Sequence, residues 1–412
     1  MSELQRQTRR ERRFSDVEAS LPTFSPHTSV TLDPTAPVAS AKSTLADLLS
    51  YLGPYNPRPL PLTENDAVWL FDNTAFRTED GAWQAEFVAA VFTREPSTRL
   101  MDAVVQVADK LGLGANDPRL ATIEERLRPF LMDILPGRLV TADFAGVKEL
   151  SLGPGGRNGI SSDVHELHDL QTGSVVSAKA KAPEGATGLL DMKTHFVEDS
   201  GWGVISDIDD TIKVTMTSDP LGILTSTFLS EPIPVPGIPD LYKYIQSLIT
   251  PASPFFYLSA SPYNLYPFLR GFRDQHYPQG QIILRDASWM SIPGLLSSLT
   301  LGTHEYKVDR MHKINSWLPG KKMICIGDST QSDPESYGEI YRTFPGWVHV
   351  ILIRKARDIA ELGIEAKNEP ARFETAFEGV PRSVWHVFED PKECYDIIKE
   401  AVFKGLIVEG RN

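Results

Sequence analysis

The second part of the chain, from about residue 203 onward, alternates between short apolar runs and longer segments in which apolar residues recur with helical spacing. The apolar runs, which predict strands, are residues 204–206, 255–258, 281–284, 322–326 and 348–353. The segments that predict helices are residues 238–249, 264–272, 306–318 and 334–344. Successive strand–helix units over residues 203–412 favour an α/β fold with a doubly wound, mostly parallel sheet, ending in a helix over residues 392–403.

Residues 63–202 have a different pattern, in which predicted strands dominate. The strands are expected at residues 68–71, 83–92, 138–144, 148–152, 174–180 and 189–196, and two helices at 98–113 and 117–135 interrupt them. This order predicts a β-rich accessory domain, a β-sandwich with a helical insertion. The glycine-rich residues 153–159 lack the lysine and hydroxyl residue that end a P-loop, so we interpret them as a hairpin loop. No clear further ligand completes a metal site with His165, His168 and His195, which we interpret as surface or core residues.

Residues 1–62 are rich in serine, threonine and proline and are predicted to be largely disordered, with one short helix at residues 45–52. The proline-rich residues 57–61 favour an extended polyproline structure, which fits either a stiff linker or a ligand for an SH3-type domain. Five arginines near the N-terminus fit either a solvated tail or a patch for an anionic partner or membrane surface; they are Arg6, Arg9, Arg10, Arg12 and Arg13.

Composition narrows the class of protein. The chain has 412 residues, enough for two sizeable cores, and a formal net charge of -13, which argues against general affinity for nucleic acid. No apolar run is long enough to predict a transmembrane span. The two cysteines, Cys325 and Cys394, give no disulfide framework and suit the cytoplasm; Cys325 lies in an apolar run and is predicted to be a core residue.

An acidic cluster follows the first apolar run of the α/β region. Asp207 and Asp209 are two residues apart, and Thr211 closes the cluster. Alternate residues of a strand point the same way, so both carboxylates could face one pocket at the carboxyl end of the strand. One carboxylate could act as a nucleophile and its neighbour as general acid and base, and the cluster could hold a hard cation. Taken alone, the same residues fit an acidic turn equally well.

Further polar residues follow later apolar runs and favour the catalytic interpretation. Ser259 and Ser261 follow residues 255–258, where a hydroxyl could bind a phosphoryl oxygen. Asp328, with Asp333 five residues beyond it, follows residues 322–326 as a second acidic cluster. Phosphoryl transfer to a carboxylate needs a cation and a fixed positive charge to offset the repulsion of the phosphate. Lys307 is the candidate for that charge, and Lys313 is its rival on the same predicted helix.

These motifs, in this order, resemble those of the haloacid dehalogenase superfamily. They are Asp207-Ile208-Asp209-Asp210-Thr211, Tyr257-Leu258-Ser259-Ala260-Ser261-Pro262, Tyr306-Lys307 and Ile326-Gly327-Asp328-Ser329, with Asp333-Pro334-Glu335 beyond. More narrowly, residues 200–395 are similar to the catalytic domain of the fungal actin-patch phosphatidate phosphatases. Pro234-Val235-Pro236-Gly237 and Trp385-His386-Val387-Phe388 add to that likeness.

The resemblance implies a Mg²⁺-dependent reaction that converts phosphatidate to diacylglycerol. Asp207 would form an aspartyl-phosphate, and Asp209 would serve as acid and then base. Phosphoryl oxygens would be held by Ser259 and Lys307, with Thr211 and Ser261 beside the substrate. Mg²⁺ would be bound by Asp207, the Asp209 carbonyl, Asp328 and Asp333. A phospholipid at a membrane surface, partners at cortical actin patches and a cytoplasmic location with peripheral membrane association are also implied.

The intervals between these motifs are too short for the large cap domain that many superfamily members carry, and an open site fits a lipid headgroup or a protein. Two apolar groups could rest on acyl chains or pack locally as core; they are Leu221, Ile223, Leu224, Phe228 and Leu229, and Trp289, Met290, Ile292, Leu295 and Leu296. The alternative functions are a phosphatase for a protein or a soluble phosphoester, and an interaction protein of actin patches or endocytic sites.

Overall fold

The computed structural model describes Leu49 and residues 52–156, 158–168, 171–285, 302–357 and 364–409. The expected helix at residues 45–52 lies almost wholly outside these residues. The N-terminal arginines and the second apolar group, which runs from Trp289 to Leu296, also lie outside them. None of the helices in the described part is both long and apolar enough to cross a lipid bilayer.

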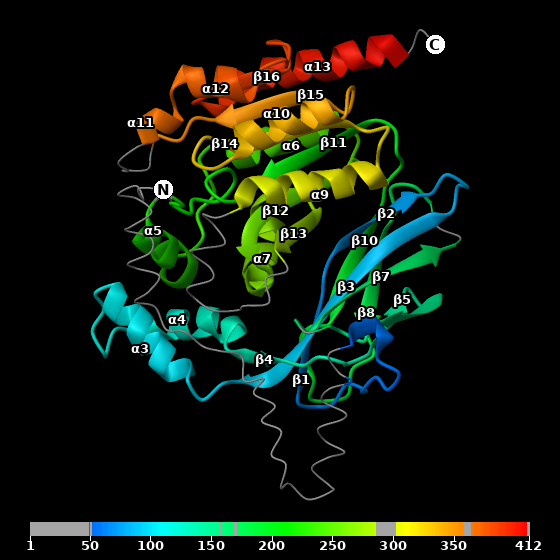
Figure 1. The fold of residues 1–412 in the computed structure, drawn as a ribbon, viewed down its shortest axis with the longest axis vertical. Helices are drawn as coiled ribbons and strands as arrows, with labels where there is room; N and C mark the ends of the chain where they lie inside the picture. Colours follow the sequence, from blue (N-terminus) through cyan, green and yellow to red (C-terminus); the bar gives the residue numbers. More distant parts are fainter. Residues whose placement is uncertain are drawn as a thin grey trace, which may run out of the picture.

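A six-stranded parallel sheet forms the centre of the second part of the chain (Figure 1). Its order is β13-β12-β11-β14-β15-β16, and every neighbouring pair is parallel. The strands are β11 (Trp202–Asp207), β12 (Phe255–Pro262), β13 (Gln281–Arg285), β14 (Lys322–Asp328), β15 (Val348–Arg354) and β16 (Trp385–Phe388). The predicted mixed α/β character is confirmed, although β16 was not among the strands expected from the pattern. The strand order reverses between β11 and β14, where ligands bind in many open sheets of this kind.

Helices cover both faces of this sheet. One face packs against α6 (Ile238–Leu248), α7 (Tyr266–His276) and α13 (Cys394–Glu409), and the other against α9 (Thr303–Trp317), α10 (Asp333–Thr343) and α12 (Pro370–Ala376). Strand β14 shows why: Ile324 and Ile326 belong to the first core, whereas Met323 and Cys325 belong to the second. Because both faces are buried, the strand is apolar throughout rather than alternating. The burial of Cys325 agrees with its predicted place in the core.

The strands between Asp66 and Phe196 form one hydrogen-bonded sheet of ten. They are β1 (Asp66–Leu70), β2 (Asn73–Arg77), β3 (Trp83–Pro96), β4 (Met132–Ile134), β5 (Val140–Phe144), β6 (Lys148–Leu152), β7 (Ile160–Leu167), β8 (Val175–Ala180), β9 (Thr187–Leu189) and β10 (Asp191–Phe196). The rings of Phe87 on β3 and Phe144 on β5 lie 5.9 Å apart, although these strands are not neighbours in the sheet. The sheet therefore folds over its own core, where the sequence led us to expect the two sheets of a sandwich. Helices α3 (Leu100–Lys110) and α4 (Leu120–Leu127) form the insertion between β3 and β4.

Two loops of this region differ from their interpretation. Residues 153–159 join β6 to β7, but β6 pairs with β5 and β7 pairs with β3, so they are not a hairpin loop. The side chains of residues 57–61 are exposed, yet the backbone of Leu60 is fixed to the sheet: its N–H donates to the Gly137 carbonyl and its carbonyl accepts from Leu139 N–H, both at 2.9 Å. This proline-rich segment is thus tied to the folded body rather than acting only as a linker.

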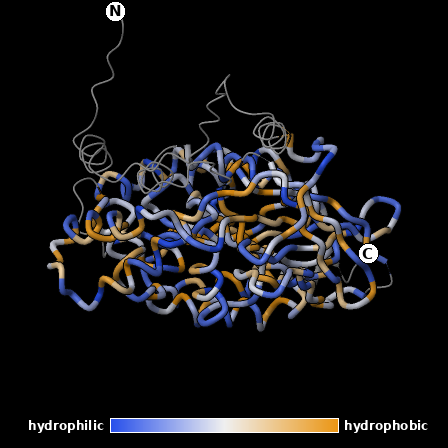
Figure 2. Tube along the Cα trace, turned by 90° about the horizontal axis from the view of Figure 1, so that it is seen from below, coloured by the Kyte–Doolittle hydropathy of each residue, from blue (hydrophilic) through white to orange (hydrophobic). Residues whose placement is uncertain are grey.

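The ten-stranded sheet and the parallel sheet share one aromatic core. Tyr263, just after β12, lies 6.5 Å from the Trp69 ring and 6.0 Å from the Phe92 ring, and Tyr266 lies 4.4 Å from the Phe71 ring. Runs of hydrophobic residues accordingly cross the middle of the molecule (Figure 2). The first sheet therefore holds the segment that leads from β12 into α7.

A buried ion pair lies beside this aromatic core. The Asp72 carboxylate accepts a hydrogen bond from the Arg273 guanidinium at 2.8 Å, and the two side chains are 0% and 1% exposed. The Asp72 backbone N–H donates to the Tyr266 hydroxyl at 2.7 Å. Because a buried charge left without a partner is strongly destabilising, this contact fixes α7 against the first sheet.

Candidate active site

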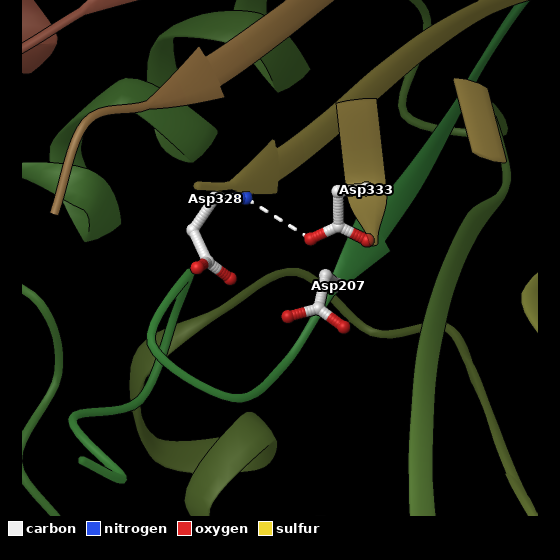
Figure 3. A group of neighbouring side chains, drawn as sticks. All are labelled: Asp207, Asp328 and Asp333. Atoms are coloured by element: carbon white, nitrogen blue, oxygen red, sulfur yellow. Dashed lines mark hydrogen bonds between the residues drawn. The ribbon is translucent and has the colours of Figure 1, made fainter. Parts of the chain in front are cut away.

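Three carboxylates meet where the strand order of the parallel sheet reverses. Asp207 is the last residue of β11, Asp328 is the last residue of β14, and Asp333 is the first residue of α10. One carboxylate oxygen from each lies within 4.8 Å of the others, and all three side chains are buried (Figure 3). The Asp328 backbone N–H donates to Asp333 Oδ2 at 3.0 Å, so the short loop between them is closed by its own hydrogen bond.

Lys307 lies in this cluster, and Lys313 does not. The Lys307 ammonium lies 2.6 Å from Asp207 Oδ1 and forms a second ion pair with Asp333. Burial opposes its charge, but the carboxylates of Asp207 and Asp333 together raise the pKa of Lys307 above its usual value. Lys313 instead pairs with Glu86 on β3, at 2.6 Å. The structure thus gives the two candidate lysines different partners and brings only Lys307 to the acidic site.

The negatively charged neighbours of the Asp207 carboxylate outnumber its positively charged neighbour, Lys307. Burial raises the pKa of Asp207 well above its usual value, and the neighbouring Asp333 carboxylate raises it further. Apart from the Lys307 ion pair, neither oxygen of Asp207 has a hydrogen-bond partner among the described residues. Three buried carboxylates with one lysine leave an excess of negative charge, and hard cations favour oxygen ligands of this kind. The donor set therefore fits a divalent cation such as Mg²⁺.

Asp209 faces a different set of groups. The spacing of Asp207 and Asp209 predicted that both would point the same way from one strand. Strand β11 ends at Asp207, however, so Asp209 lies in the loop that follows it. Its carboxylate accepts hydrogen bonds from Ser259 Oγ at 2.5 Å and from Thr215 Oγ1 at 2.8 Å. Ser261 Oγ donates to the same carboxylate at 3.3 Å. The Ser259 hydroxyl proton is thus directed at Asp209 in this structure.

The remaining predicted residue, Thr211, contacts the metal-binding candidates directly. Its hydroxyl donates to Asp328 Oδ2 at 3.1 Å, and the Thr330 backbone N–H donates to Asp328 Oδ1 at 2.5 Å. Burial and the Asp333 carboxylate raise the pKa of Asp328. Both oxygens of Asp328 are therefore oriented by protein donors, one of which is the Thr211 hydroxyl.

Asp210 has a structural role that the sequence analysis did not assign. Its backbone has a φ of 61°, and its carboxylate accepts from the backbone N–H groups of Thr215, Met216 and Thr217 at 2.7–2.8 Å. Thr217 Oγ1 adds a fourth hydrogen bond at 2.7 Å. These bonds curl the chain after β11 back on itself and hold Thr215 against Asp209. The Arg354 guanidinium, at the end of β15, donates to the Asp210 carbonyl at 2.9 Å. Arg354 was not predicted as a site residue, although its position at the end of a predicted strand could have indicated it.

The apolar segment after this loop packs mainly as core, with Leu221 and Leu229 half-buried. Leu224 and Phe228, in α5 (Pro220–Leu224) and the following π-helical turn η3 (Thr225–Leu229), are both 0% exposed. The Phe228 ring packs edge-on against Phe130 at 5.5 Å, and Arg126 of α4 donates to the Ser230 carbonyl. Of the two interpretations that the sequence left open, the structure therefore supports local core packing for Leu224 and Phe228, because the helical insertion packs against this segment.

Comparison with known proteins supports the motif-based resemblance. Residues 202–355 match the family model described as "Phosphatidate phosphatase APP1, catalytic domain". Residues 202–355 are similar to that catalytic domain. Phosphatidate phosphatase APP1 of Saccharomyces cerevisiae is 31% identical over 163 residues, which are 39% of this chain and 27% of the yeast protein. An uncharacterized protein of Schizosaccharomyces pombe is 27% identical over 160 residues, 38% of this chain and 25% of that protein. The alignments cover about a quarter of the length of either relative. The segment that matches the family model, residues 202–355, includes every predicted site residue.

Proposed function

We propose that the protein is a Mg²⁺-dependent phosphatase of the haloacid dehalogenase type whose substrate is phosphatidate. The observation that carries the proposal is the contact of the buried Asp207 carboxylate with Lys307 beside Asp328 and Asp333, at the reversal point of the sheet. The similarity of residues 202–355 to a phosphatidate phosphatase catalytic domain supports the same activity.

The proposed cation would be held by the carboxylates of Asp207, Asp328 and Asp333 and by the backbone carbonyl of Asp209. When bound, Mg²⁺ would neutralise negative charge on the phosphoryl group and reduce its repulsion of the nucleophile. The protein contributes a fixed arrangement: Thr211 and Thr330 orient the Asp328 carboxylate, and the Asp328 N–H orients Asp333.

In the proposed reaction, Asp207 attacks phosphorus with one carboxylate oxygen. The bond from phosphorus to the lipid oxygen breaks, and the Asp209 carboxylic acid gives its proton to that oxygen. The Asp209 carboxylate then takes a proton from a water molecule, which attacks the aspartyl-phosphate and releases phosphate and free Asp207. Lys307 holds a phosphoryl oxygen throughout, and the hydroxyl of Ser259 turns from Asp209 to a phosphoryl oxygen when the substrate binds.

The choice of phosphatidate as the substrate rests on the similarity of residues 202–355 to a phosphatidate phosphatase catalytic domain, and not on the apolar residues 221–229. Leu224 and Phe228 are buried, so these two side chains do not distinguish a lipid from a soluble phosphoester. A phosphatase for a protein or a soluble phosphoester is therefore the alternative that an experiment must separate. Peripheral binding to a membrane and a place at cortical actin patches belong to the same proposal.

The deciding experiment measures phosphate release from phosphatidate in mixed micelles and from a panel of soluble phosphoesters, each with and without Mg²⁺. Asp207→Asn serves as the control for contaminating phosphatases. The proposal predicts Mg²⁺-dependent release with a higher kcat/KM on phosphatidate than on any soluble substrate. Preference for a soluble phosphoester would overturn the lipid substrate, and equal release without Mg²⁺ would overturn the metal-dependent chemistry.

A further inference from the structure

One arginine side chain donates hydrogen bonds to the loop between the two carboxylates Asp328 and Asp333. Arg372 lies on α12, which packs beside α10 near the end of β14 (Figure 1). Its Nη1 donates to the carbonyls of Ser329 at 2.6 Å and Lys367 at 3.0 Å, and its Nη2 donates to the Gln331 carbonyl. Its Nε and Nη2 also donate to the two carboxylate oxygens of Glu335 at 2.8 and 2.9 Å. All five N–H groups of the guanidinium are therefore used.

These bonds reach both sides of the proposed metal loop. The carbonyls of Ser329 and Gln331 flank Thr330, and the Thr330 N–H is the donor to Asp328 Oδ1. Glu335 lies in the first turn of α10, two residues after Asp333. A single rigid group thus fixes the backbone that orients Asp328 and the helical turn that presents Asp333.

The arrangement of these five hydrogen bonds requires an arginine, and a lysine could not replace it. A guanidinium offers five donors in one plane, whereas a lysine ammonium offers three donors from a single point. No ammonium group can reach three carbonyls and both oxygens of Glu335 together. Lysine at this position would keep the charge but release part of the loop.

We infer that Arg372 is a positioning residue that sets the separation of Asp328 and Asp333 and through it the affinity for the divalent cation. The inference rests on the proposed function, and it concerns a residue beyond the matched segment 202–355. Groups that orient metal ligands typically change affinity or activity by about 10–100-fold when they are removed. Arg372 acts through the loop and does not touch the substrate.

A matched control separates positioning from simple packing of α12. Arg342 on α10 donates to the carbonyls of Ala376 at 3.1 Å and Glu378 at 2.9 Å, at the other end of α12. Within the described part of the chain, the Arg342 guanidinium makes no hydrogen bond to the loop of residues 328–333. Arg342→Met therefore loosens the attachment of α12 but leaves the hydrogen bonds of the loop in place.

The experiment compares wild type, Arg372→Met, Arg372→Lys and Arg342→Met by two measurements. The first is the rise in Tm on titration with Mg²⁺ alone, and the second is the Mg²⁺ concentration that gives half of the maximal phosphatase rate. We expect both measurements to show Mg²⁺ affinity weakened by about 10-fold or more in Arg372→Met, and substantially weakened in Arg372→Lys. Arg342→Met should lower the Tm without Mg²⁺ but keep the wild-type Mg²⁺ dependence.

The outcomes separate this inference from the proposed function. Wild-type protein without any Mg²⁺-dependent rise in Tm or rate would overturn the metal site itself. A wild type that binds Mg²⁺, together with Arg372 variants of unchanged Mg²⁺ affinity, would overturn only the role of Arg372. Full recovery of affinity in Arg372→Lys would also overturn it, since charge alone would then suffice.

Discussion

The Lys307 ammonium lies 2.6 Å from Oδ1 of Asp207, so the proposed nucleophile and the proposed phosphate-binding cation touch each other in this structure. Both side chains are 1% exposed. A phosphoryl group that enters the site would replace part of this contact with bonds to its own oxygens. In the proposed reaction Lys307 would thereby have two successive partners, first the carboxylates and then the phosphate.

The two candidate lysines make a direct test of this arrangement. Lys307→Met should lower kcat/KM by about 10²–10³-fold, because a buried donor to the developing charge is lost. Lys313→Met removes the pair with Glu86 and the contact of the ammonium with the Trp317 ring, neither of which reaches the acidic site, and should stay close to wild type. Steady-state kinetics on phosphatidate micelles, with circular dichroism to verify folding, would measure both. Equal losses in the two variants would exclude a specific role for Lys307.

Asp207→Asn should abolish turnover while the fold is kept. An amide is a poor nucleophile, and the loss expected for a residue of this kind is on the order of 10⁴-fold or more. Single-turnover assays and a thermal melt of the same preparation would check activity and folding together. Activity above about a tenth of wild type would remove Asp207 from the role of nucleophile, because the loss expected for such a residue is far larger.

Asp328→Ala should raise the Mg²⁺ requirement more than it lowers the rate at saturating Mg²⁺. Mg²⁺ keeps several water ligands, so one lost carboxylate weakens binding before it eliminates the site. The measurement is a titration of phosphatase rate with Mg²⁺ at fixed substrate. A titration curve that matches wild type would rule out Asp328 as a ligand.

Phe228→Ala should destabilise the protein by about 3–5 kcal/mol, because the ring is fully buried against Phe130. Ile233, which follows the same segment and is 58% exposed, provides a control: Ile233→Ala should change stability little. Urea unfolding measures both. If Phe228→Ala keeps wild-type stability and loses activity only on micelles, the contact with acyl chains would have to be reinstated.

His195 should make the protein less stable as the pH falls from about 6.5 to about 4. Burial lowers the pKa of His195 to about 4, with Arg273 and Lys193 adding to the effect and Asp72 opposing it. Between these pH values the unfolded chain takes up a proton that the folded chain does not, so the folded state loses up to about 3 kcal/mol on acidification. The free energies of unfolding of wild type and His195→Gln should therefore differ by a pH-dependent amount in this window. A constant difference would contradict the shifted pKa.

Five of the six strands of the parallel sheet could be predicted because each contains a run of mostly apolar residues. Their order in the chain was enough to bring Asp207 and Asp328 to one edge. Strand β7 escaped prediction because one face is solvated and its sequence is mostly polar, and β16 because only four residues form it. The burial of Phe228 depends on Phe130, almost a hundred positions earlier, and no local pattern reports such a partner. Arg372 gave no signal either, since an arginine on a short helix usually faces solvent.

The aromatic contacts of Tyr263 and Tyr266 with the first sheet have a consequence for how the protein melts. The region of recognisable similarity begins at residue 202, but the core that stabilises it begins more than a hundred residues earlier, at Ala67 and Trp69. The matched segment and the hydrophobic core that supports it therefore have different boundaries in this chain. Heating should disrupt both sheets in one calorimetric transition, and a fragment that starts at Trp202 would expose to water Tyr263 and Tyr266, which follow Ser259 and Ser261 in the chain.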